Sequence, residues 1–346
     1  MLRRVIAGVA ALAAVYSVAG NAAADSVADF YKGKQVSIVI GSDAGSGFDA
    51  YARLVARHLG EHIPGNPIVV PSNKPGAGSL MMTNALVLNG PFDGTFIGAP
   101  QSSAPVEKLL HLASPGGSAA QFDPTKLNWL GSASQDVFIL FDWNSAKVKS
   151  FADLQNEEML LGSSGLNTDG SLISAALNKI LGTKIRLVTG YQTSGAEMLA
   201  MERGEVDGNA MAYASVVTMH PDWVKDGKIR ILAQMANEPQ PGLENVPFVL
   251  DLVKDADDRA VLRLIFAKYQ MGRPFFVPPG VPEDRVAALR TAFDATMKDP
   301  ALLADAATER LEVRPVSGDD VTALIAKLYE TPEPLVQRAR DVLGTK

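Results

Sequence analysis

Apolar and polar positions follow two patterns that take turns along the chain. Short apolar runs, such as residues 36–41 ("VSIVIG") and 137–143 ("VFILFDW"), predict buried strands. Stretches with apolar residues three and four positions apart, such as residues 49–62, are typical of helices packed along one face. Because strands alternate with helices and small polar residues lie between them, the chain predicts an α/β fold with mostly parallel sheets.

The alternation falls into two series. The first contains strands at 36–41, 67–72 and 93–100 and helices at 49–62 and 80–88, with Ser79 as the expected N-cap of the second helix. A loop is expected at 112–126, and a second series begins near Asn128. We predict two doubly wound α/β domains with a ligand cleft between them: residues 25–131 with 241–346 form domain I, and residues 132–240 form domain II.

The first 24 residues have the pattern of a secretory signal peptide. A basic start, "MLRR", precedes a 16-residue apolar run, and "NAAA" before Asp25 provides an A-x-A cleavage site. The alternative is a membrane anchor, but the apolar run is shorter than the roughly 20 residues that span a bilayer. We therefore expect an exported protein cleaved after about Ala24, with a soluble mature chain.

The composition limits the possible partners. The chain has a formal net charge of −6 and no cysteine, and no basic run stands out. This argues against nucleic acid as a partner. A negative chain does not attract anions through its overall field, so we expect any anion site to be formed locally by backbone dipoles.

Three loops share one design, in which a strand leads through small polar residues into a helix. They are residues 41–48 ("GSDAGSGF"), 162–169 ("GSSGLNTD") and 189–196 ("TGYQTSGA"). Such loops lie at the carboxyl edge of a sheet, where the first N–H groups of the next helix are unpaired. They predict a site for a carboxylate or phosphate that needs no Arg or Lys; the alternative is that each loop is only a connecting turn.

Other motifs do not support a competing chemistry. The glycine spacing of residues 41–48 fits neither G-x-G-x-x-G nor a P-loop, so a nucleotide is not expected. "HLGEH" at 58–62 matches a metalloprotease pattern, but Gly60 is expected to interrupt the helix, so we interpret this segment as a solvated helix end. Asp207 could be a catalytic carboxylate, although a structural or ligand-bonding role fits better because no acid or base partner is nearby. We expect no cofactor and no metal.

The motifs together resemble the periplasmic receptors of tripartite tricarboxylate transporters, the TctC or Bug family. The resemblance rests on "GSGFDAYAR" at 45–53, on "NKPGAG" at 73–78 and on "DGT" at 93–95 in the first half. In the second half it rests on "SSGLNT" at 163–168, "YQTSG" at 191–195 and "GEVD" at 204–207. It covers essentially the whole mature chain.

The resemblance implies a periplasmic flytrap of the type II binding-protein kind, without catalytic residues. Such a receptor grips one carboxylate of a small organic acid and delivers the acid to membrane transporter subunits; capture and delivery favour a monomer. Two alternatives are a receptor that presents its ligand to a signalling system and a periplasmic enzyme. The ligand-binding residues expected from the loops and the resemblance are Ser42, Asp43, Ala44, Gly45, Ser46, Gly47, Phe48, Asp49, Gln101, Ser102, Ser163, Ser164, Asn167, Thr168, Tyr191, Thr193, Ser194, Gly195, Ala196 and Asp207.

Two departures from the family pattern bear on the ligand. Phe48 replaces the usual Thr or Ser, which removes a hydroxyl group and adds an aromatic wall. Asp43 adds a negative charge to the anion loop, where it either faces solvent or meets a hydroxyl or ammonium group of the ligand.

Overall fold

The apolar runs form two separate sheets. The structure, a computed structural model, describes residues 26–112, 120–166 and 168–345. The first sheet has the order β11-β4-β10-β3-β1-β2 and the second the order β7-β6-β8-β5-β9. The first consists of β1 (Gln35–Ile40), β2 (Ile68–Asn73), β3 (Phe96–Ala99), β4 (Asn128–Ser132), β10 (Pro274–Val277) and β11 (Val316–Ser317). The second consists of β5 (Phe138–Trp143), β6 (Met159–Ser163), β7 (Ile185–Thr189), β8 (Gly208–Ala212) and β9 (Ile229–Met235).

The expected α/β fold with two sheets is confirmed, but the prediction of mostly parallel sheets is wrong. Parallel pairing joins β1 to β2 and β3, and joins β6 to β7 and β8. In contrast, β10 is antiparallel to β3 and β4, and β5 is antiparallel to β8 and β9. The strand β11 is likewise antiparallel to β4. Two of the reversed strands, β5 and β10, are those at which the chain crosses between the sheets: β5 follows β4 directly, and β10 follows the elements of the second sheet. A strand that arrives from the other sheet runs against its new neighbours.

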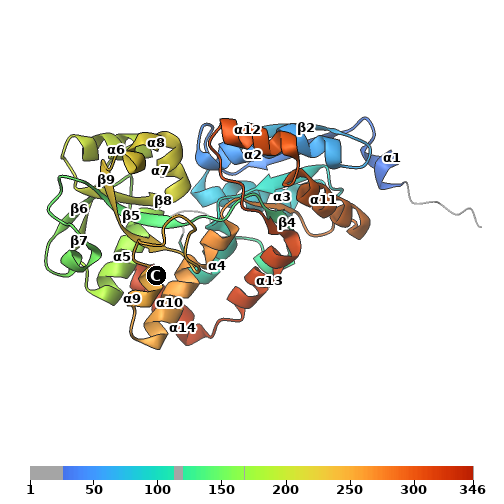
Figure 1. Ribbon diagram of the computed structural model, residues 1–346. Helices are drawn as coiled ribbons and strands as arrows, with labels where there is room; N and C mark the ends of the chain where they lie inside the picture. Colours follow the sequence, from blue (N-terminus) through green and yellow to red (C-terminus); the bar gives the residue numbers. More distant parts are fainter. Residues whose placement is uncertain (1–25, 113–119, 167, 346) are drawn as a thin grey trace, which may run out of the picture.

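Helices surround both sheets (Figure 1). The first half of the molecule consists of the first sheet and the helices α1 (Val27–Tyr31), α2 (Gly47–His62), α3 (Leu80–Asn89), α4 (Glu107–Leu110), α11 (Glu283–Thr296), α12 (Pro300–Thr308) and α13 (Gly318–Tyr329). The second half consists of the second sheet and the helices α5 (Asp169–Leu181), α6 (Ser194–Glu202), α7 (Tyr213–Met219), α8 (Pro221–Lys225), α9 (Val249–Leu252), α10 (Ala256–Phe266) and α14 (Glu333–Leu343). Short 3₁₀ helices are η1 (Ala77–Ser79), η2 (Ala104–Val106), η3 (Pro124–Lys126), η4 (Phe151–Gln155) and η5 (Ala267–Met271).

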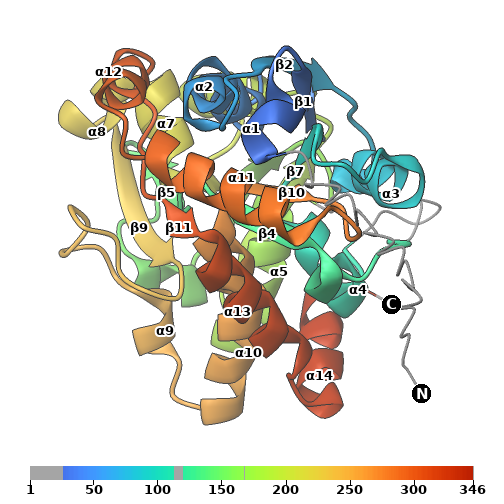
Figure 2. The same cartoon turned by 90° about the vertical axis from the view of Figure 1, so that its right-hand side faces the viewer.

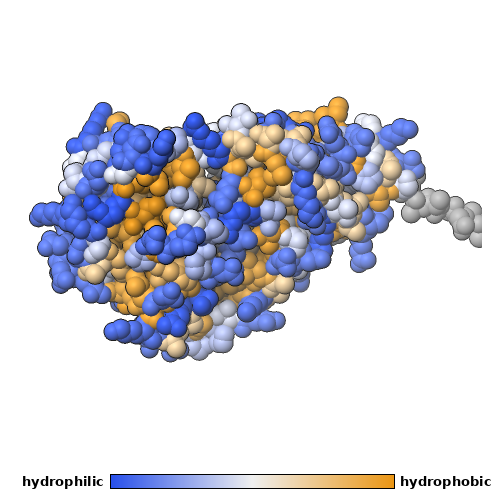
Figure 3. Space-filling view, in the orientation of Figure 1, coloured by the Kyte–Doolittle hydropathy of each residue, from blue (hydrophilic) through white to orange (hydrophobic). Residues whose placement is uncertain are grey.

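Helices from distant parts of the chain form the lower layer of the molecule. The helix α14 packs against both α10 and α5, and α9 packs against β9 (Figures 1 and 2). Segments that follow the second series along the chain therefore pack beneath the second sheet. On the face shown in Figure 3, polar residues cover the outer edges and apolar residues lie between them.

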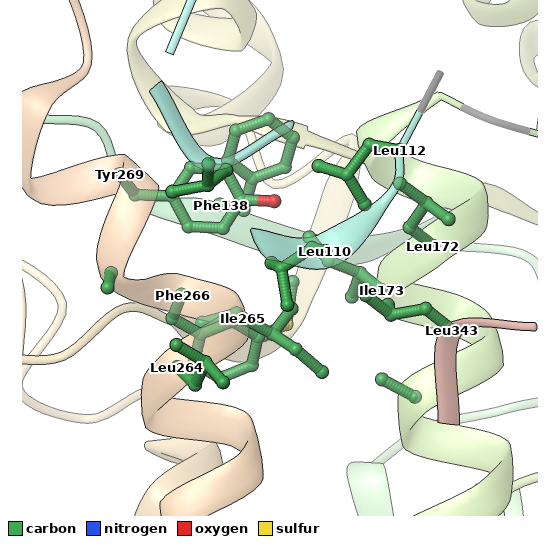
Figure 4. Close-up of a cluster of buried hydrophobic side chains, with 14 of the residues drawn as sticks. Leu110, Leu112, Phe138, Leu172, Ile173, Leu264, Ile265, Phe266, Tyr269 and Leu343 are labelled. Atoms are coloured by element: carbon green, nitrogen blue, oxygen red, sulfur yellow. The ribbon is translucent and has the colours of Figure 1, made fainter. Parts of the chain in front are cut away.

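One apolar cluster links these elements. Figure 4 shows Phe138 of β5 beside Tyr269 of η5, with leucine and isoleucine side chains of α4, α5, α10 and α14 around them. The rings of Phe138 and Tyr269 stack with their centroids 4.3 Å apart. Because each fully buried Leu or Ile contributes roughly 1.5–3 kcal/mol, this cluster fixes the lower ends of both halves.

Local predictions for the first half are largely confirmed. The predicted helix at 49–62 corresponds to α2, which begins two residues earlier at Gly47. Gly60 lies inside α2 and does not interrupt it; a Cβ atom there would lie 2.5 Å from the carbonyl oxygen of Pro67, so the glycine permits close packing. The histidines of "HLGEH" each contact a different aspartate near α12: His58 contacts Asp305 and His62 contacts Asp299. The predicted signal peptide and residues 113–119 of the predicted loop lie outside the described residues.

Candidate functional site

The loop before α2 is built around the start of that helix. Ser46 is the N-cap residue, and its Oγ accepts a hydrogen bond from the N–H of Asp49 at 3.2 Å. The Oγ atoms of Ser42 and Ser46 lie 2.9 Å apart. Gly45 has φ +81°, a conformation that favours glycine. The loop therefore holds the helix start and its unpaired N–H groups in one place.

The carboxylate of Asp49 holds this loop in place through hydrogen bonds. Its buried carboxylate accepts hydrogen bonds from the N–H of Gly45 at 2.8 Å, from Arg53 Nε at 2.9 Å and from Asn73 Nδ2 at 2.8 Å. Burial alone would raise the pKa of Asp49, but the hydrogen bonds from Arg53, Gly45 and Asn73 lower it below its ordinary value. Asp49 is thus an ionised carboxylate that accepts its hydrogen bonds from within the protein and so holds the loop in place.

Ser79 has a different role from the one expected. It precedes α3, but it has φ +75° and its side chain makes no capping bond. Its Oγ instead donates to the carbonyl oxygen of Gly41 at 2.9 Å and accepts from the N–H of Gln101 at 2.9 Å. Ser79 therefore stands at the N-cap position of α3, as predicted, but its side chain does not cap the helix. It joins the loops that follow β1 and β3 instead and so helps to place Ser102.

The two loops of the second half also lead into capped helices. Thr168 caps α5 by accepting from the N–H of Ser171, and Ser163 Oγ lies within hydrogen-bonding distance of both hydroxyl groups, at 3.0 Å and 2.7 Å. Thr193 caps α6 by accepting from the N–H of Ala196 at 3.2 Å. Small hydroxyl side chains therefore set the start of each helix, as in the first half.

A cavity of about 240 Å³ lies where these elements meet. Both halves of the molecule contribute to its wall: α2 and the loop after β3 on one side, and β6, β8, α5 and α6 on the other. The lining residues are Gly47, Phe48, Ser102, Asp136, Phe138, Gly162, Ser163, Ser164, Thr168, Asp169, Gly170, Ser194, Glu197, Asn209, Ala210, Met211, Ala212, Ser215 and Arg273. The structure thus brings the three small-residue loops to a single cavity.

The predicted site residues divide into two groups. Those that line the cavity are Gly47, Phe48, Ser102, Ser163, Ser164, Thr168 and Ser194. The residues that do not line the cavity are Ser42, Asp43, Ala44, Gly45, Ser46, Asp49, Gln101, Tyr191, Thr193, Gly195, Ala196 and Asp207. Asn167 lies outside the described residues.

Two members of the second group have clear positions. Asp43 is exposed to solvent. Asp207 lies directly before β8, where its Oδ2 accepts from the N–H of Leu160 at 2.7 Å. Since the cavity is lined by the later residues of β8, the Asp207 carboxylate joins two strands at the opposite edge of the sheet.

Charged side chains also line the cavity, which the sequence did not indicate. Arg273 precedes β10 and is 5% exposed, and its Nη1 lies 2.5 Å from Asp136 Oδ2. Asp169, at the start of α5, is paired with the buried Lys268. The expectation of a site without Arg or Lys did not include this arginine in the cavity wall. Neither member of the Arg273–Asp136 pair lies in a small-residue loop, and they are distant in the sequence, so no local pattern could reveal them.

Burial changes the acids of the cavity. It raises the pKa of Asp136, although the Arg273 charge opposes the change. It also raises the pKa of Glu197, despite hydrogen bonds from Asn209 and Ser164. The Nδ2 of Asn209 donates to Glu197 Oε2 at 2.9 Å. The wall therefore contains one guanidinium group and three carboxyl groups. Asp136 and Asp169 are paired with basic side chains, whereas Glu197 accepts hydrogen bonds from neutral groups.

Within residues 26–112, 120–166 and 168–345, no group of His, Cys, Asp and Glu side chains is placed to hold a metal ion. In the same part of the chain, none of the helices has both the length and the apolar composition that crossing a bilayer requires.

Two α/β halves with a polar cavity between them are the architecture expected of a solute-binding receptor. Residues 51–340 match the family described as "Tripartite tricarboxylate transporter family receptor", or TctC. The chain belongs to this family of tripartite tricarboxylate transporter receptors. No functionally curated protein sequence matches it.

Solved structures of similar fold cover nearly the whole chain. A TctC solute-binding protein from Polaromonas has a TM-score of 0.68 and 19% identity, covering 89% of this chain and 99% of its own. The MatC protein of Rhodopseudomonas palustris, solved with malate, has a TM-score of 0.61 and 16% identity, with coverages of 90% and 99%. Another R. palustris protein, solved with adipate, has a TM-score of 0.63 and 21% identity, with coverages of 90% and 97%. At these identities the likeness establishes a shared fold.

Proposed function

We propose that this protein captures a small organic acid in the cavity between its two sheets and delivers it to a membrane transporter of the tripartite tricarboxylate type. The observation that carries the proposal is the cavity wall, in which Gly47 and Ser102 from the first half face Ser163, Thr168 and Ser194 from the second. Helix N-termini and short hydroxyl side chains are suited to a carboxylate. The malate and adipate held by two proteins of the same fold support this ligand class.

Capture on this plan includes closure of the two halves. A ligand that contacts both sides of the cavity stabilises the closed state over the open one. We propose that residues 25–131 with 241–346 form one closing unit and residues 132–240 the other, acting as a monomer. The second sheet lies entirely within 138–235, which supports this division. In it, α9, α10 and α14 belong to the first unit although they pack beneath the second sheet.

The protein acts, in this proposal, as a receptor and not as an enzyme. The family consists of receptors, and the acids Asp136 and Asp169 of the cavity are held in ion pairs with basic side chains. NMR of a bound acid incubated with the protein for a day tests this. Release of the unchanged acid is expected, and turnover would contradict it.

Export to the periplasm belongs to the same proposal. The mature protein should begin near Asp25, once the leader described above is removed. Mass spectrometry of protein isolated from the periplasm tests this prediction, and an intact N-terminus there would refute it.

The direct test of binding is a thermal-shift and calorimetric screen of residues 25–346 against mono-, di- and tricarboxylates. A ligand at 100 times its dissociation constant adds about 2.7 kcal/mol to the free energy of unfolding. Gly47→Val is the matched variant: its Cβ would point toward Arg273 Nη2, 3.7 Å away, so the larger side chain fills the cavity. We expect this variant to lose binding at least 100-fold with an unchanged melting temperature.

The control is Ala307→Val, an exposed position at the end of α12. It makes a similar β-branched change and should bind as the unsubstituted protein does. Failure of every carboxylate to bind would refute the proposed function, and equal binding by Gly47→Val would refute the site.

A further inference from the structure

Arg273 has hydrogen-bonding capacity left over inside the cavity wall. Its Nη1 donates to Asp136 and to the carbonyl oxygen of Gly272 at 2.9 Å. Its Nε is buried and has no hydrogen-bond partner among the described residues. A buried donor without a partner is costly, so a site for an acceptor is expected beside it. The Arg273 side chain, 5% exposed, lines the cavity where that acceptor would come from.

The contacts of the Arg273 side chain place the side of its guanidinium group that has no hydrogen-bond partner beside the start of α2. The guanidinium carbon lies 4.3 Å from the centroid of the Phe48 ring and 5.0 Å from that of Tyr51. Its Nη2 lies 3.7 Å from the position a Cβ atom would take at Gly47. The Arg273 guanidinium and the first N–H groups of α2 therefore lie beside one another. A carboxylate there would receive charge-assisted hydrogen bonds from a fixed, planar donor. This is the cationic pole of the cavity.

Glu197 provides the opposite pole. It lies in the first turn of α6, is 6% exposed and lines the same cavity. The other two carboxyl groups of the wall have cationic partners, Arg273 for Asp136 and Lys268 for Asp169. Among the described residues Glu197 has no such partner. It accepts hydrogen bonds from neutral groups only, the amide of Asn209 at 2.9 Å and the side chain and backbone of Ser164. A buried carboxyl group without a cation is rare unless something else supplies the charge.

We propose that the ligand is a small amino acid in the chemical sense: one carboxylate, and a primary ammonium group remote from it. The carboxylate binds Arg273 and the start of α2, and the ammonium group binds Glu197. This deepens the proposed function and rests on it. The two internal ion pairs cancel their own charges, so an ionised Glu197 leaves the wall one negative charge in excess. Burial alone disfavours that ionised form, and a neighbouring ammonium group favours it. A dicarboxylate would place its second negative charge in the same cavity as this acid, whereas an ammonium group would compensate it.

The test compares acids of equal length that differ at one end only. Residues 25–346 are titrated calorimetrically with 6-aminohexanoate, hexanoate and adipate, and with 4-aminobutanoate, butanoate and succinate. In at least one of the two series, the amino acid should bind at least tenfold more tightly than the monoacid, and the diacid should bind most weakly.

Two variants assign the poles. Glu197→Gln keeps the shape and the bond to Asn209 but removes the charge; it should weaken binding of the amino acid at least tenfold and change that of the monoacid less than threefold. Glu205→Gln makes the same change at an exposed residue outside the cavity wall and should leave all affinities unchanged. Arg273→Lys retains the charge but loses the planar fork, and should weaken the amino acid and the monoacid alike.

The outcomes separate the two proposals. If, in both series, the diacid or the monoacid binds as tightly as its amino counterpart, the zwitterion assignment is overturned and the carboxylate receptor is left standing. The same holds if Glu197→Gln keeps the full preference, or if none of the amino acids binds while another carboxylate of the larger screen does. Failure of every carboxylate in that screen refutes the proposed function itself.

Discussion

The buried pair Arg273–Asp136 should show strong energetic coupling. The side chains are 5% and 4% exposed, and Nη1 lies 2.5 Å from Oδ2. Arg273→Met leaves Asp136 as an unpaired buried acid, and Asp136→Leu leaves an unpaired buried guanidinium. Removing one partner of a buried pair costs about 3–5 kcal/mol, whereas replacing both with apolar residues is often neutral. The double variant should therefore be more stable than either single variant.

The magnitude follows from what each variant leaves behind. In the double variant no unpaired charge remains, and the methionine side chain that replaces Arg273 can still contact the rings of Phe48 and Tyr51. The loss that remains is the cation–π contact, about 1–2 kcal/mol. The sum of the single effects is about 6–10 kcal/mol and the double variant loses about 1–2 kcal/mol, so the coupling energy should be at least about 4 kcal/mol.

Urea unfolding followed by circular dichroism measures these energies by linear extrapolation. The matched control is Arg186–Glu158, a pair on the surface with side chains 59% and 56% exposed. Its single and double variants should differ by no more than about 1 kcal/mol. If the effects of the Arg273 and Asp136 substitutions were additive, with a coupling energy no larger than that of the surface pair, the reasoning that the cavity pair is desolvated would be refuted.

Three further predictions concern the supports of the site. Asp49→Asn removes the ionised acceptor that holds the loop before α2, so the free energy of unfolding should fall by about 1–3 kcal/mol and ligand affinity about tenfold, measured by urea unfolding and calorimetry. Burial raises the pKa of Asp142 to about 7, against the opposing charge of Arg230, so the folded protein keeps a proton that the unfolded chain releases above about pH 4. Relative to the Asp142→Asn variant, the free energy of unfolding of the unsubstituted protein should therefore fall as the pH rises from about 4 to about 7. A difference between the two that does not change with pH would contradict this. Gly208→Ala places a Cβ atom 2.1 Å from an opposing carbonyl oxygen and should cost at least about 2 kcal/mol, whereas Gly165→Ala, with open space around it, should cost less than about 1 kcal/mol in the same assay.

Much of the fold could be predicted from the sequence because its signals are local. The apolar run at 36–41 and the spacing at 49–62 correspond to β1 and α2, since burial of one strand or one helix face leaves a periodic trace. Strand direction leaves no such trace. The apolar run at 137–143 has the same composition whether β5 runs with its neighbours or against them, so the mixed sheets could not be predicted.

The polar half of the cavity could be predicted for the same reason, and the charged half could not. Glycine and serine gather within each loop, so the loops that contain Gly47, Ser163 and Ser194 are visible locally. Arg273 and Asp136 are single charges beside apolar strands, and they meet only when β10 returns next to β4. Glu197 lies on a helix whose buried side is decided by the sheet beneath it.

The charge arrangement also explains how a negative protein can bind an acid. The net charge of −6 does not attract an anion from solution, and the nearby acids Asp136 and Asp169 would repel one if they were unpaired. Pairing removes that repulsion without removing the donors, because Arg273 meets Asp136 through one nitrogen and keeps its Nε free. A ligand of zero net charge is not repelled by the overall field, and at close range it can still satisfy both Arg273 and Glu197. A dianion would gain less from the same cavity, because its second negative charge would lie beside Glu197.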